Sequence, residues 1–387
     1  MEVKQFTDAK AGRVVPIATR AGADYAFVPN PLPGSWRMHP DRWPLVAKAQ
    51  HHVGRLEQIK GILPNPSLLL RPLQRREAIH SSILEGTYTT PEQLLLYEQA
   101  LSDGAAKPET DSRKSDEPAN EEVYNCNEAL REGHNWISAG KPLNEELILL
   151  LHRILMTGAR GKDKRPGEFR TKQNFVGGRK FIPPPIGELQ GCIHDFIAYL
   201  GSNDDTFDPL VRAYVVHYQF EAIHPFEDGN GRVGRLLLSL CVSKWCDLTM
   251  PWLYMSEYFE RNRHEYVTGL FRISTHGEWD EWIDFCLRGT IEQATDAIDR
   301  CKKLQDLRDG YHEKLSGLGP RMHEIVELLF KHPVIRTGDV RDACDVSYET
   351  ARVDTGKLVE AGIIQKIEGR YPQAFAAREI LDVAYGS

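Results

Sequence analysis

HPFEDGNGRVGR, residues 224–235, is the stretch that decides the fold. Gly229 and Gly231 have no side chains, so the backbone can turn tightly there and point its N–H groups outward. The apolar run at residues 236–242 follows directly and predicts a buried helix. The turn therefore lies at a helix N-terminus, where free N–H groups and the helix dipole favour an anion.

The charged side chains of this stretch complete a phosphate site. Arg232 and Arg235 are three residues apart, so they share one side of the helix, and guanidinium groups match phosphate oxygens. The carboxylate of Asp228 stands beside the anion site, which is how Mg²⁺ is usually held next to substrate phosphates. His224 can accept a proton near neutral pH. The combination predicts transfer of part of a nucleotide to a nucleophile.

Each of these residues also has an ordinary interpretation when it is taken alone. A histidine before a proline is common at a helix end, and paired arginines are common on a solvated face. The arrangement of all of them within one helix start is far more specific than any single residue.

At every defined position the stretch matches the motif HPFx(D/E)GNGRxxR, and the chain therefore resembles the Fic family. The resemblance covers residues 67–288. It implies a mostly helical Fic core that acts most often as an adenylyltransferase, moving AMP from ATP to a protein hydroxyl.

The resemblance implies a role for each motif residue. His224 would be the general base, and Asp228 would hold Mg²⁺. Toxins of the Doc type, which phosphorylate their targets, carry a lysine where Gly231 stands, so the resemblance argues against phosphorylation. In the remaining roles, Phe226 anchors the loop in the core, Gly229, Asn230 and Gly231 cradle the phosphates, and Arg232 and Arg235 grip the distal phosphates.

A competing pattern, GxGxxG, fits Gly229, Gly231 and Gly234. That pattern indicates a dinucleotide site only when it follows a strand inside a βαβ unit. Here Asp208 and Pro209 have the order of an N-cap and a first helical residue, so a helix is expected before the glycines. We therefore reject the dinucleotide interpretation.

The composition describes a globular protein of two or three domains, with 387 residues of which 41% are hydrophobic and 27% charged. The net charge of −7 gives no general attraction to nucleic acids or membranes. Seven cysteines without a CxxC pair or zinc spacing suit reduced thiols. No apolar signal core or membrane-length run is visible. We expect a cytoplasmic protein with no membrane partner.

The N-terminal residues 1–66 are expected to form an extended arm, rich in proline and glycine up to about residue 45, and then helices. A helix over residues 67–84 is predicted to end at Gly86, a natural C-terminal cap. Glu85 opposes the helix dipole there, and its ordinary interpretation is a solvated side chain.

The segment from Ser81 to Gly86 is also similar to the inhibitory motif (S/T)xxxE(G/N) of Fic enzymes. The resemblance implies that Glu85 pairs with Arg235. That pairing would take the arginine from the γ-phosphate and place a negative charge where the phosphate belongs, so ATP would bind in the wrong pose.

Residues 67–122 are expected to combine this inhibitory region with a polar, mobile linker from 102 to 122. The catalytic core would then span residues 123–290. Within it, Gly177-Gly178 lies between two strand-like stretches and predicts a β-hairpin. It is either a simple surface hairpin or an edge that pairs with an extended peptide.

The hairpin resembles the Fic flap, which aligns the target segment, and the implied flap contacts are Asn174, Phe175, Val176, Gly177, Phe181 and Ile182. By family position Tyr258 and Asn262 would contact the nucleotide, although core packing is an equally good interpretation of the aromatic residues here. A short apolar helix at 279–287 and a polar helix at 292–309 are expected next, the latter within a connecting segment 291–317.

Residues 318–387 are expected to form a separate module of three helices and a hairpin, which looks like a winged helix and often binds DNA. This module has nine Lys/Arg and eleven Asp/Glu, a net charge of 9 − 11 = −2. A DNA-binding domain should show a basic face. Docking of another protein, or a second copy in a homodimer, is therefore favoured over DNA.

The sequence thus predicts a mostly α-helical Fic core with a β-hairpin flap and a small C-terminal winged-helix-like domain. The predicted activity is transfer of AMP from Mg²⁺-ATP to a protein Ser, Thr or Tyr hydroxyl, with inhibition by Glu85. Two alternatives stay open. The same residues could remove AMP, with Glu85 positioning a water, or a winged-helix regulator could use a non-catalytic Fic core as a nucleotide sensor.

Overall fold

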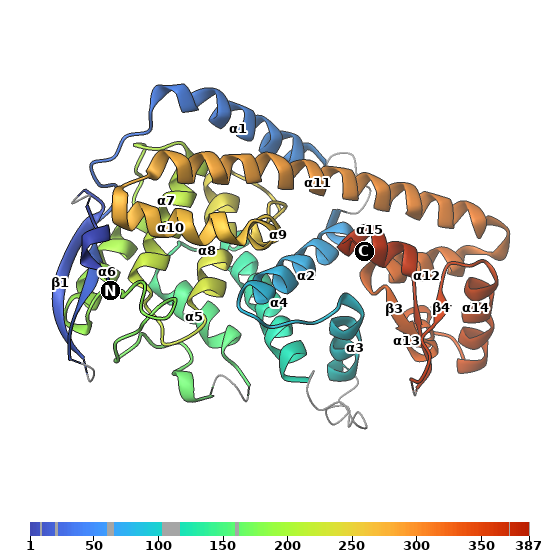
Figure 1. Cartoon of the computed structure of the whole chain (residues 1–387). Helices are drawn as coiled ribbons and strands as arrows, with labels where there is room; N and C mark the ends of the chain where they lie inside the picture. The colour runs from blue at the N-terminus through green and yellow to red at the C-terminus, as the bar shows by residue number, and fades with distance from the viewer. Residues whose placement is uncertain are drawn as a thin grey trace. The chain divides into compact units, whose positions relative to one another are not determined.

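The computed structural model describes residues 1–7, 10–19, 22–59, 66–102, 117–158, 162–370 and 372–386. The chain is mostly helical with a few short strands, which confirms the predicted fold class (Figure 1). It divides into two compact units. The first unit comprises residues 1–57, 80–87 and 125–294, and the second comprises residues 58–79, 88–124 and 295–387.

Two adjacent helices, α7 (Pro209–Ile223) and α8 (Asn230–Trp245), form the centre of the first unit. The side chain of Asp208 accepts a hydrogen bond from the Leu210 N–H and Pro209 is the first helical residue, so the predicted N-cap is confirmed. Almost every residue of α7 is buried, because other elements pack around it. Besides α8, these are α6 (Ile186–Leu200), α10 (Arg263–His276) and strand β2 (Gly22–Pro29), while α5 (Glu145–Leu155) packs on α8 and α9 (Ser256–Arg261) on α10.

An aromatic cluster joins α7 to α9, α10 and the start of α11 (Trp279–Lys314). Phe259 stacks on Tyr266 with ring centroids 4.4 Å apart, and the ring of His217 is 5.9 Å from each of them. Trp282 closes the cluster and donates its indole N–H to the Tyr214 carbonyl. The predicted helices at 279–287 and 292–309 are parts of this single helix α11, so the predicted break between them is wrong.

The N-terminal arm is not simply extended, as the sequence had suggested. Strands β1 (Gly12–Thr19) and β2 (Gly22–Pro29) pair in antiparallel register, from Gly12 opposite Pro29 to Thr19 opposite Gly22. Gly12 is required at the base of the hairpin, because a Cβ there would lie 2.4 Å from the Val28 carbonyl oxygen. The short helices η1 (Val3–Gln5) and η2 (Pro40–Arg42) and helix α1 (Trp43–Gln58) complete this region.

Helices α2 (Pro66–Leu84), α3 (Pro91–Ser102) and α4 (Glu117–Ser138) follow. Gly86 adopts the left-handed conformation, with φ +84°, as predicted for a helix cap. Most of the predicted polar linker, residues 103–116, lies outside the described residues. Residues 117–122 form the first turns of α4, so the linker prediction is wrong there.

The predicted β-hairpin of the core is reduced to a single bridge between Val176 and Phe181, preceded by the short helix η4 (Lys162–Lys164). Three consecutive residues, Gly177, Gly178 and Arg179, have positive φ angles of 56°, 65° and 74°. The left-handed backbone makes a tight turn but prevents the ladder from extending.

The second unit contains the predicted winged-helix-like domain. Its sheet has the order β3-β5-β4, with antiparallel pairs throughout. Strand β3 and the final helix were not predicted. The elements are η5 (Ser316–Leu318), α12 (Pro320–Lys331), β3 (Val334–Arg336), α13 (Thr337–Cys344), α14 (Tyr348–Glu360), β4 (Gln365–Lys366), β5 (Ala374–Ala376) and α15 (Arg378–Tyr385).

Buried ion pairs stabilise the helices of the second unit. Arg75 of α2 pairs with Glu98 of α3 at 2.7 Å and also donates to the Lys331 carbonyl of α12. Asp296 of α11 accepts from both Arg76 and Arg300. All seven cysteines are free thiols, and no described helix is both long and apolar enough to cross a membrane.

The contact between Gly289 of α11 and Tyr258 gives a test of core packing. A Cβ at position 289 would lie 2.4 Å from the Tyr258 ring, so we expect Gly289→Ala to lower the free energy of unfolding by roughly 1–3 kcal/mol. Gly310→Ala in the same helix meets no atom within 4 Å and should instead raise it by up to about 1 kcal/mol. Urea unfolding of both variants makes the comparison, and equal effects would contradict it.

Candidate active site

The motif loop connects two buried helices through two left-handed residues. His224 ends α7 with φ +51°, and Gly229 precedes α8 with φ +75°. A Cβ at position 229 would lie 3.0 Å from Met156 Sδ and 3.3 Å from Leu155, so glycine is required by both conformation and space. The loop therefore has one conformation that the surrounding core specifies.

Asn230 locks this loop with two hydrogen bonds to one residue. Its Oδ1 accepts from the Phe226 N–H at 2.8 Å, and its Nδ2 donates to the Phe226 carbonyl at 2.9 Å. The side chain of Asn230 is thus occupied inside the loop, and any phosphate contact here must come from its backbone N–H. Phe226 is fully buried, as the resemblance implied for a core anchor.

Glu85 occupies the start of α8, where the sequence predicts an anion. A Cβ at Gly231 would lie 2.2 Å from the Glu85 Oε1 atom, which places this carboxylate against the first turn of the helix. Glu85 also accepts from the Arg235 Nη2 atom at 2.8 Å, so the predicted ion pair is present. The guanidinium of Arg235 donates in addition to the Ser81 hydroxyl at 2.9 Å and to the Ser81 carbonyl at 2.7 Å.

The two partners of this ion pair differ in burial. Only 3% of the Arg235 side chain is exposed, against 38% of the Glu85 side chain. Burial opposes the charge on Glu85, but Arg235, helped by Arg232, keeps the pKa of this carboxyl below its usual value. The pair is therefore ionised at neutral pH, and its acidic member stays accessible to solvent.

His224 is held as a neutral base. Burial, followed by the nearby Arg170, lowers the pKa of His224 to about 4, and a hydrogen bond to the Glu221 backbone carbonyl opposes this shift. One ring nitrogen therefore carries a proton and donates to Glu221, which leaves the other as an acceptor. Arg170 also donates from Nε to the His224 carbonyl at 2.8 Å, so a residue that the sequence did not single out fixes this end of the loop.

His152 fixes the other end of the loop and was also missed. Its Nδ1 accepts from the Gly167 N–H at 2.9 Å, so the proton is on Nε2, which donates to the Asp228 carbonyl at 3.2 Å. Its ring stacks on Phe226 with centroids 3.7 Å apart. A lone histidine in an apolar helix gives no sequence signal for this role, because the bonding partners come from distant segments.

Asp228 is an exposed carboxylate beside the anion-binding turn. Its Oδ1 accepts from the Gly229 N–H at 2.7 Å, and its Oδ2 has no hydrogen bond to a described residue. The described residues hold no group of three potential metal ligands. A single carboxylate next to a phosphate site fits Mg²⁺, which takes most of its remaining ligands from water and phosphate.

The flap is attached to the motif loop. Asn174 donates from Nδ2 to the Phe226 carbonyl at 2.8 Å. Phe175 is exposed, Val176 and Phe181 are half-buried, and Ile182 is buried. The structure therefore brings the predicted flap residues next to the motif, while their contacts with a target stay a prediction.

Comparison with known proteins identifies the family. Residues 142–242 match the model of the Fic/DOC family, and residues 43–135 match that of the Fic/DOC family N-terminal region. The chain belongs to the Fic/DOC family. Residues 321–373 of this Fic protein match a DeoR-like helix-turn-helix domain.

Two curated relatives carry adenylyltransferase names. A probable protein adenylyltransferase of Aquifex aeolicus is 33% identical over 128 residues, which are 33% of this chain and 36% of the relative. The protein adenylyltransferase Fic of Aedes aegypti is 43% identical over 130 residues, which are 33% of this chain and 24% of the relative. The Fic chain thus spans about a third or less of the length of these relatives.

Solved Fic structures share the fold. A Fic family protein from Desulfovibrio desulfuricans G20 aligns over 88% of this chain and 97% of its own, with a TM-score of 0.56 and 22% identity. Fic-1 (residues 134–508) from C. elegans aligns over 67% of this chain and 74% of its own, with a TM-score of 0.52 and 24% identity. At these identities the likeness shows the fold alone.

Tyr258 and Asn262, the two residues predicted to contact the nucleotide, make contacts with other residues of the core in the structure. Tyr258 is buried with its ring 4.9 Å from that of Phe285, and Asn262 donates to the Tyr258 carbonyl. Burial raises the pKa of the Tyr258 phenol, which lies beside Arg288. Their contact with a nucleotide stays a prediction.

A second carboxyl group lies near the phosphate end of the Fic motif. A Cβ at Gly234 would lie 2.3 Å from the Glu221 Oε1 atom, which is buried and has no hydrogen-bond partner among the described residues. Burial raises the pKa of Glu221 to about 7, although Arg235 favours its charged form and Glu85 opposes it. Glu221 is therefore a group that can gain or lose a proton near neutral pH beside the Arg235 site.

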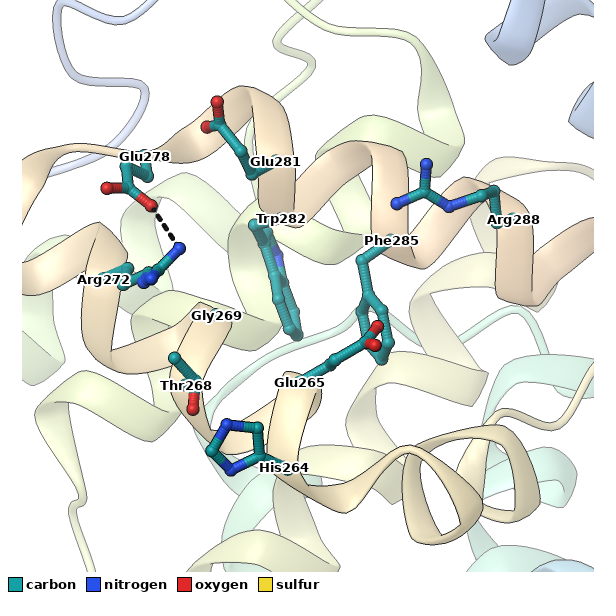
Figure 2. A pocket seen from close by; sticks show the side chains of 10 residues that line it. All are labelled: His264, Glu265, Thr268, Gly269, Arg272, Glu278, Glu281, Trp282, Phe285 and Arg288. Atoms are coloured by element: carbon teal, nitrogen blue, oxygen red, sulfur yellow. Dashed lines mark hydrogen bonds and ion pairs between the residues drawn. The ribbon is translucent and has the colours of Figure 1, made fainter.

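A separate hollow of about 280 Å³ lies between α10 and α11 (Figure 2). Arg272 and Glu278 pair across one end of it at 3.3 Å. No residue of the Fic motif, of the flap or of the segment around Glu85 lines this hollow, so it is not the predicted phosphate site. Its lining residues are His264, Glu265, Thr268, Gly269, Arg272, Glu278, Glu281, Trp282, Phe285 and Arg288.

Replacing His152 by phenylalanine tests its role in the loop. The variant keeps a ring against Phe226 but leaves the Gly167 N–H and the Asp228 carbonyl without partners. We expect a loss of roughly 2–4 kcal/mol in the free energy of unfolding, and weaker binding of ATP because the turn before Gly229 is no longer held. Urea unfolding and nucleotide titration measure the two effects, and wild-type affinity would contradict the positioning role.

Buried histidines should make the first unit sensitive to acid. Burial lowers the pKa of His134 and His217 to about 3 and that of His152 and His224 to about 4. The unfolded chain, with imidazole pKa values near 6.5, binds more protons below that pH, so stability should fall between pH 6.5 and 4. Glu221, with its raised pKa, gives a smaller opposite effect between pH 7 and 4.5.

The measurement is the free energy of urea unfolding at several pH values. His134→Gln removes one buried imidazole and should reduce the slope below pH 6.5 by about 1.4 kcal/mol per pH unit. His194→Gln, at an exposed position of α6, is the control for the substitution itself. Equal slopes for the wild type and His134→Gln would contradict the assignment.

Proposed function

We propose that this Fic protein is a protein adenylyltransferase. It would move AMP from Mg²⁺-ATP to a Ser, Thr or Tyr hydroxyl of a target protein, and Glu85 would hold it in an inhibited state. The adenylyltransferase names of the Aquifex and Aedes relatives support the activity. The observation that carries the proposal is the Glu85 carboxylate, which contacts Arg235 at the anion-binding start of α8.

In the proposed reaction the helix start and the arginines hold the phosphates of ATP. His224, neutral at physiological pH, takes the proton from the target hydroxyl through the ring nitrogen that does not donate to Glu221. The hydroxyl oxygen forms a bond to the α-phosphorus, and the bond between the α-phosphorus and the bridging oxygen of pyrophosphate breaks. Asp228 would hold Mg²⁺, which supplies positive charge to the phosphates and the leaving pyrophosphate.

Inhibition follows from competition for Arg235. Three acceptors, the Ser81 hydroxyl, the Ser81 carbonyl and the Glu85 carboxylate, surround this guanidinium. A γ-phosphate would have to displace Glu85 and would otherwise meet its negative charge. The partial exposure of Glu85 makes its displacement less costly than that of a fully buried partner.

Two alternatives have support from particular features. The position of Glu85 beside the motif would also let it orient a water for AMP removal. The DeoR-like match supports a DNA-binding regulator. In α14, however, Arg352 pairs with Glu349, and the exposed side chains include Tyr348, Val353 and Val359. These side chains of α14 favour a protein partner or a homodimer over DNA. A cytoplasmic location remains part of the proposal.

ATP labelled on the α-phosphate tests the proposal with the wild type, Glu85→Gly and Glu85→Gly/His224→Ala. We expect strong labelling of protein, in the presence of lysate as target source, only with Glu85→Gly, because it frees Arg235 and retains the base. We expect only weak labelling with the wild type and with Glu85→Gly/His224→Ala.

Glu257→Gly, which removes a carboxylate from α9, is the matched control and should behave as the wild type. Labelling by the γ-phosphate instead would indicate phosphorylation. Absence of both labels from all proteins, together with release of AMP from a pre-labelled target by the wild type, would favour the removal reaction.

A further inference from the structure

Positive charge is concentrated around the flap. Residues 160–182 contain eight Lys/Arg and two Asp/Glu, a net charge of 8 − 2 = +6, while the whole chain has a net charge of −7. The flap lies directly beside the motif loop through the hydrogen bond from Asn174 to the Phe226 carbonyl. This basic stretch of an acidic chain therefore includes the flap, which is bonded to the motif loop.

Two arginines near the flap are held by other groups of the chain. Arg170 is buried and donates to the carbonyls of His224, Lys172 and Pro184. Arg165 forms an ion pair with Glu168. These arginines hold the fold and contribute little to recognition.

The guanidinium of Arg179 has only a few, long contacts with other residues. Its guanidinium lies 4.4 Å from the centre of the Phe175 ring and contacts Thr19 and Asp24 of the N-terminal hairpin at 3.4 and 3.9 Å. It therefore joins the flap turn to the hairpin and loses part of its charge to Asp24.

Lys172 and Lys180 are different. Both are exposed, and neither ammonium group has a hydrogen bond or ion pair with any residue in the described parts of the chain. Lys172 precedes the flap and Lys180 follows its turn, so the two charges flank the main-chain segment that would face an extended peptide. An exposed lysine is commonly only a solvated group, but two of them without counter-ions on a fixed segment form a site for negative charge.

The N-terminal hairpin fixes this segment from the other side. The Phe27 N–H of β2 donates to the Ile182 carbonyl at 2.8 Å, and the Phe27 ring lies 5.8 Å from that of Phe181. The flap is thus held by the motif loop at Asn174 and by β2 at Ile182. Charges on a fixed segment can discriminate between partners, because their positions are set before binding.

We propose that Lys172 and Lys180 select target proteins in which the acceptor hydroxyl lies within an acidic extended segment. The inference rests on the proposed transfer of AMP and names the class of protein substrate. The flap main chain would align the segment, and the two ammonium groups would contact carboxylates on either side of the hydroxyl. The charges would also speed the encounter of an acidic partner.

Competition among peptides tests the inference in the Glu85→Gly background. Three peptides of equal length carry one Ser, one Thr and one Tyr, flanked by Asp/Glu, by Asn/Gln or by Lys. With α-labelled ATP, we expect kcat/KM for the acidic peptide to exceed that for the neutral one about three- to tenfold, the range that two exposed charge pairs provide. The preference should shrink as salt rises from 50 to 300 mM.

Charge reversal locates the preference. Lys172→Glu/Lys180→Glu should abolish or invert it. The matched control is Lys48→Glu/Arg55→Glu, which makes the same change of charge at exposed positions of α1 and should retain it. Helix α1 contacts Asp208 at the opposite end of α7 from His224, about 22 Å away along a 15-residue helix.

Direct binding makes the inference independent of catalysis. Fluorescence anisotropy of the labelled acidic peptide with Glu85→Gly/His224→Ala should show weaker binding on reversal at 172 and 180 and no change on reversal at 48 and 55. Equal binding of the acidic and neutral peptides overturns the inference, as does a flap reversal that raises the KM for ATP or weakens all peptides equally. If the acidic peptide binds selectively but no label is transferred to it, the role of Lys172 and Lys180 in recognition would stand and the proposed transfer of AMP would be contradicted.

Discussion

The ion pair between Arg235 and Glu85 is the interaction on which the candidate site depends. A guanidinium buried to 3% exposure needs a counter-charge, because an unpaired buried charge costs several kcal/mol. Ser81 supplies two further acceptors from the same helix end. The segment at the end of α2 thus satisfies Arg235 in the place where a phosphate is proposed to bind, so the stability of this conformation and the proposed inhibition would have one physical origin.

The turn of the motif is held in place because side chains from distant segments bond its backbone. Asn230 bonds both polar groups of the Phe226 backbone, His152 bonds the Asp228 carbonyl, and Arg170 bonds the His224 carbonyl. These hydrogen bonds fix backbone polar groups of the loop, which would otherwise have to reorganise when a phosphate binds. Preorganisation of this kind lets a site stabilise developing charge without a further cost during the reaction.

Net charge differs between the regions of the protein. The chain as a whole is acidic, the stretch around the flap is basic, and the C-terminal module is slightly acidic. In that module some of the charged residues pair with each other, as Arg321 does with Asp354 and Arg352 with Glu349. The ammonium groups of Lys172 and Lys180 at the flap have no hydrogen bond or ion pair with a described residue, and both lysines lie on a segment that is bonded to the motif loop through Asn174.

The sequence by itself determined the features that depend on local chemistry. Asp208 and Pro209 start α7, and Gly86 follows the end of α2, because capping needs only residues close in the chain. The motif also located the candidate site, and the pairing of Glu85 with Arg235 followed from a family resemblance. The periodic spacing of apolar residues predicted most helices, because the apolar face of a helix can be recognised in the sequence.

Only the tertiary structure decided the contacts between distant segments. The bonds of His152 to Gly167 and Asp228, and the burial that raises the pKa of Glu221, depend on residues far apart in the chain. The N-terminal hairpin and the single helix α11 escaped prediction because neighbouring elements, and not local preference, stabilise them. A sequence shows which residue types are present, but burial and partners, which set their chemistry, arise when the chain folds.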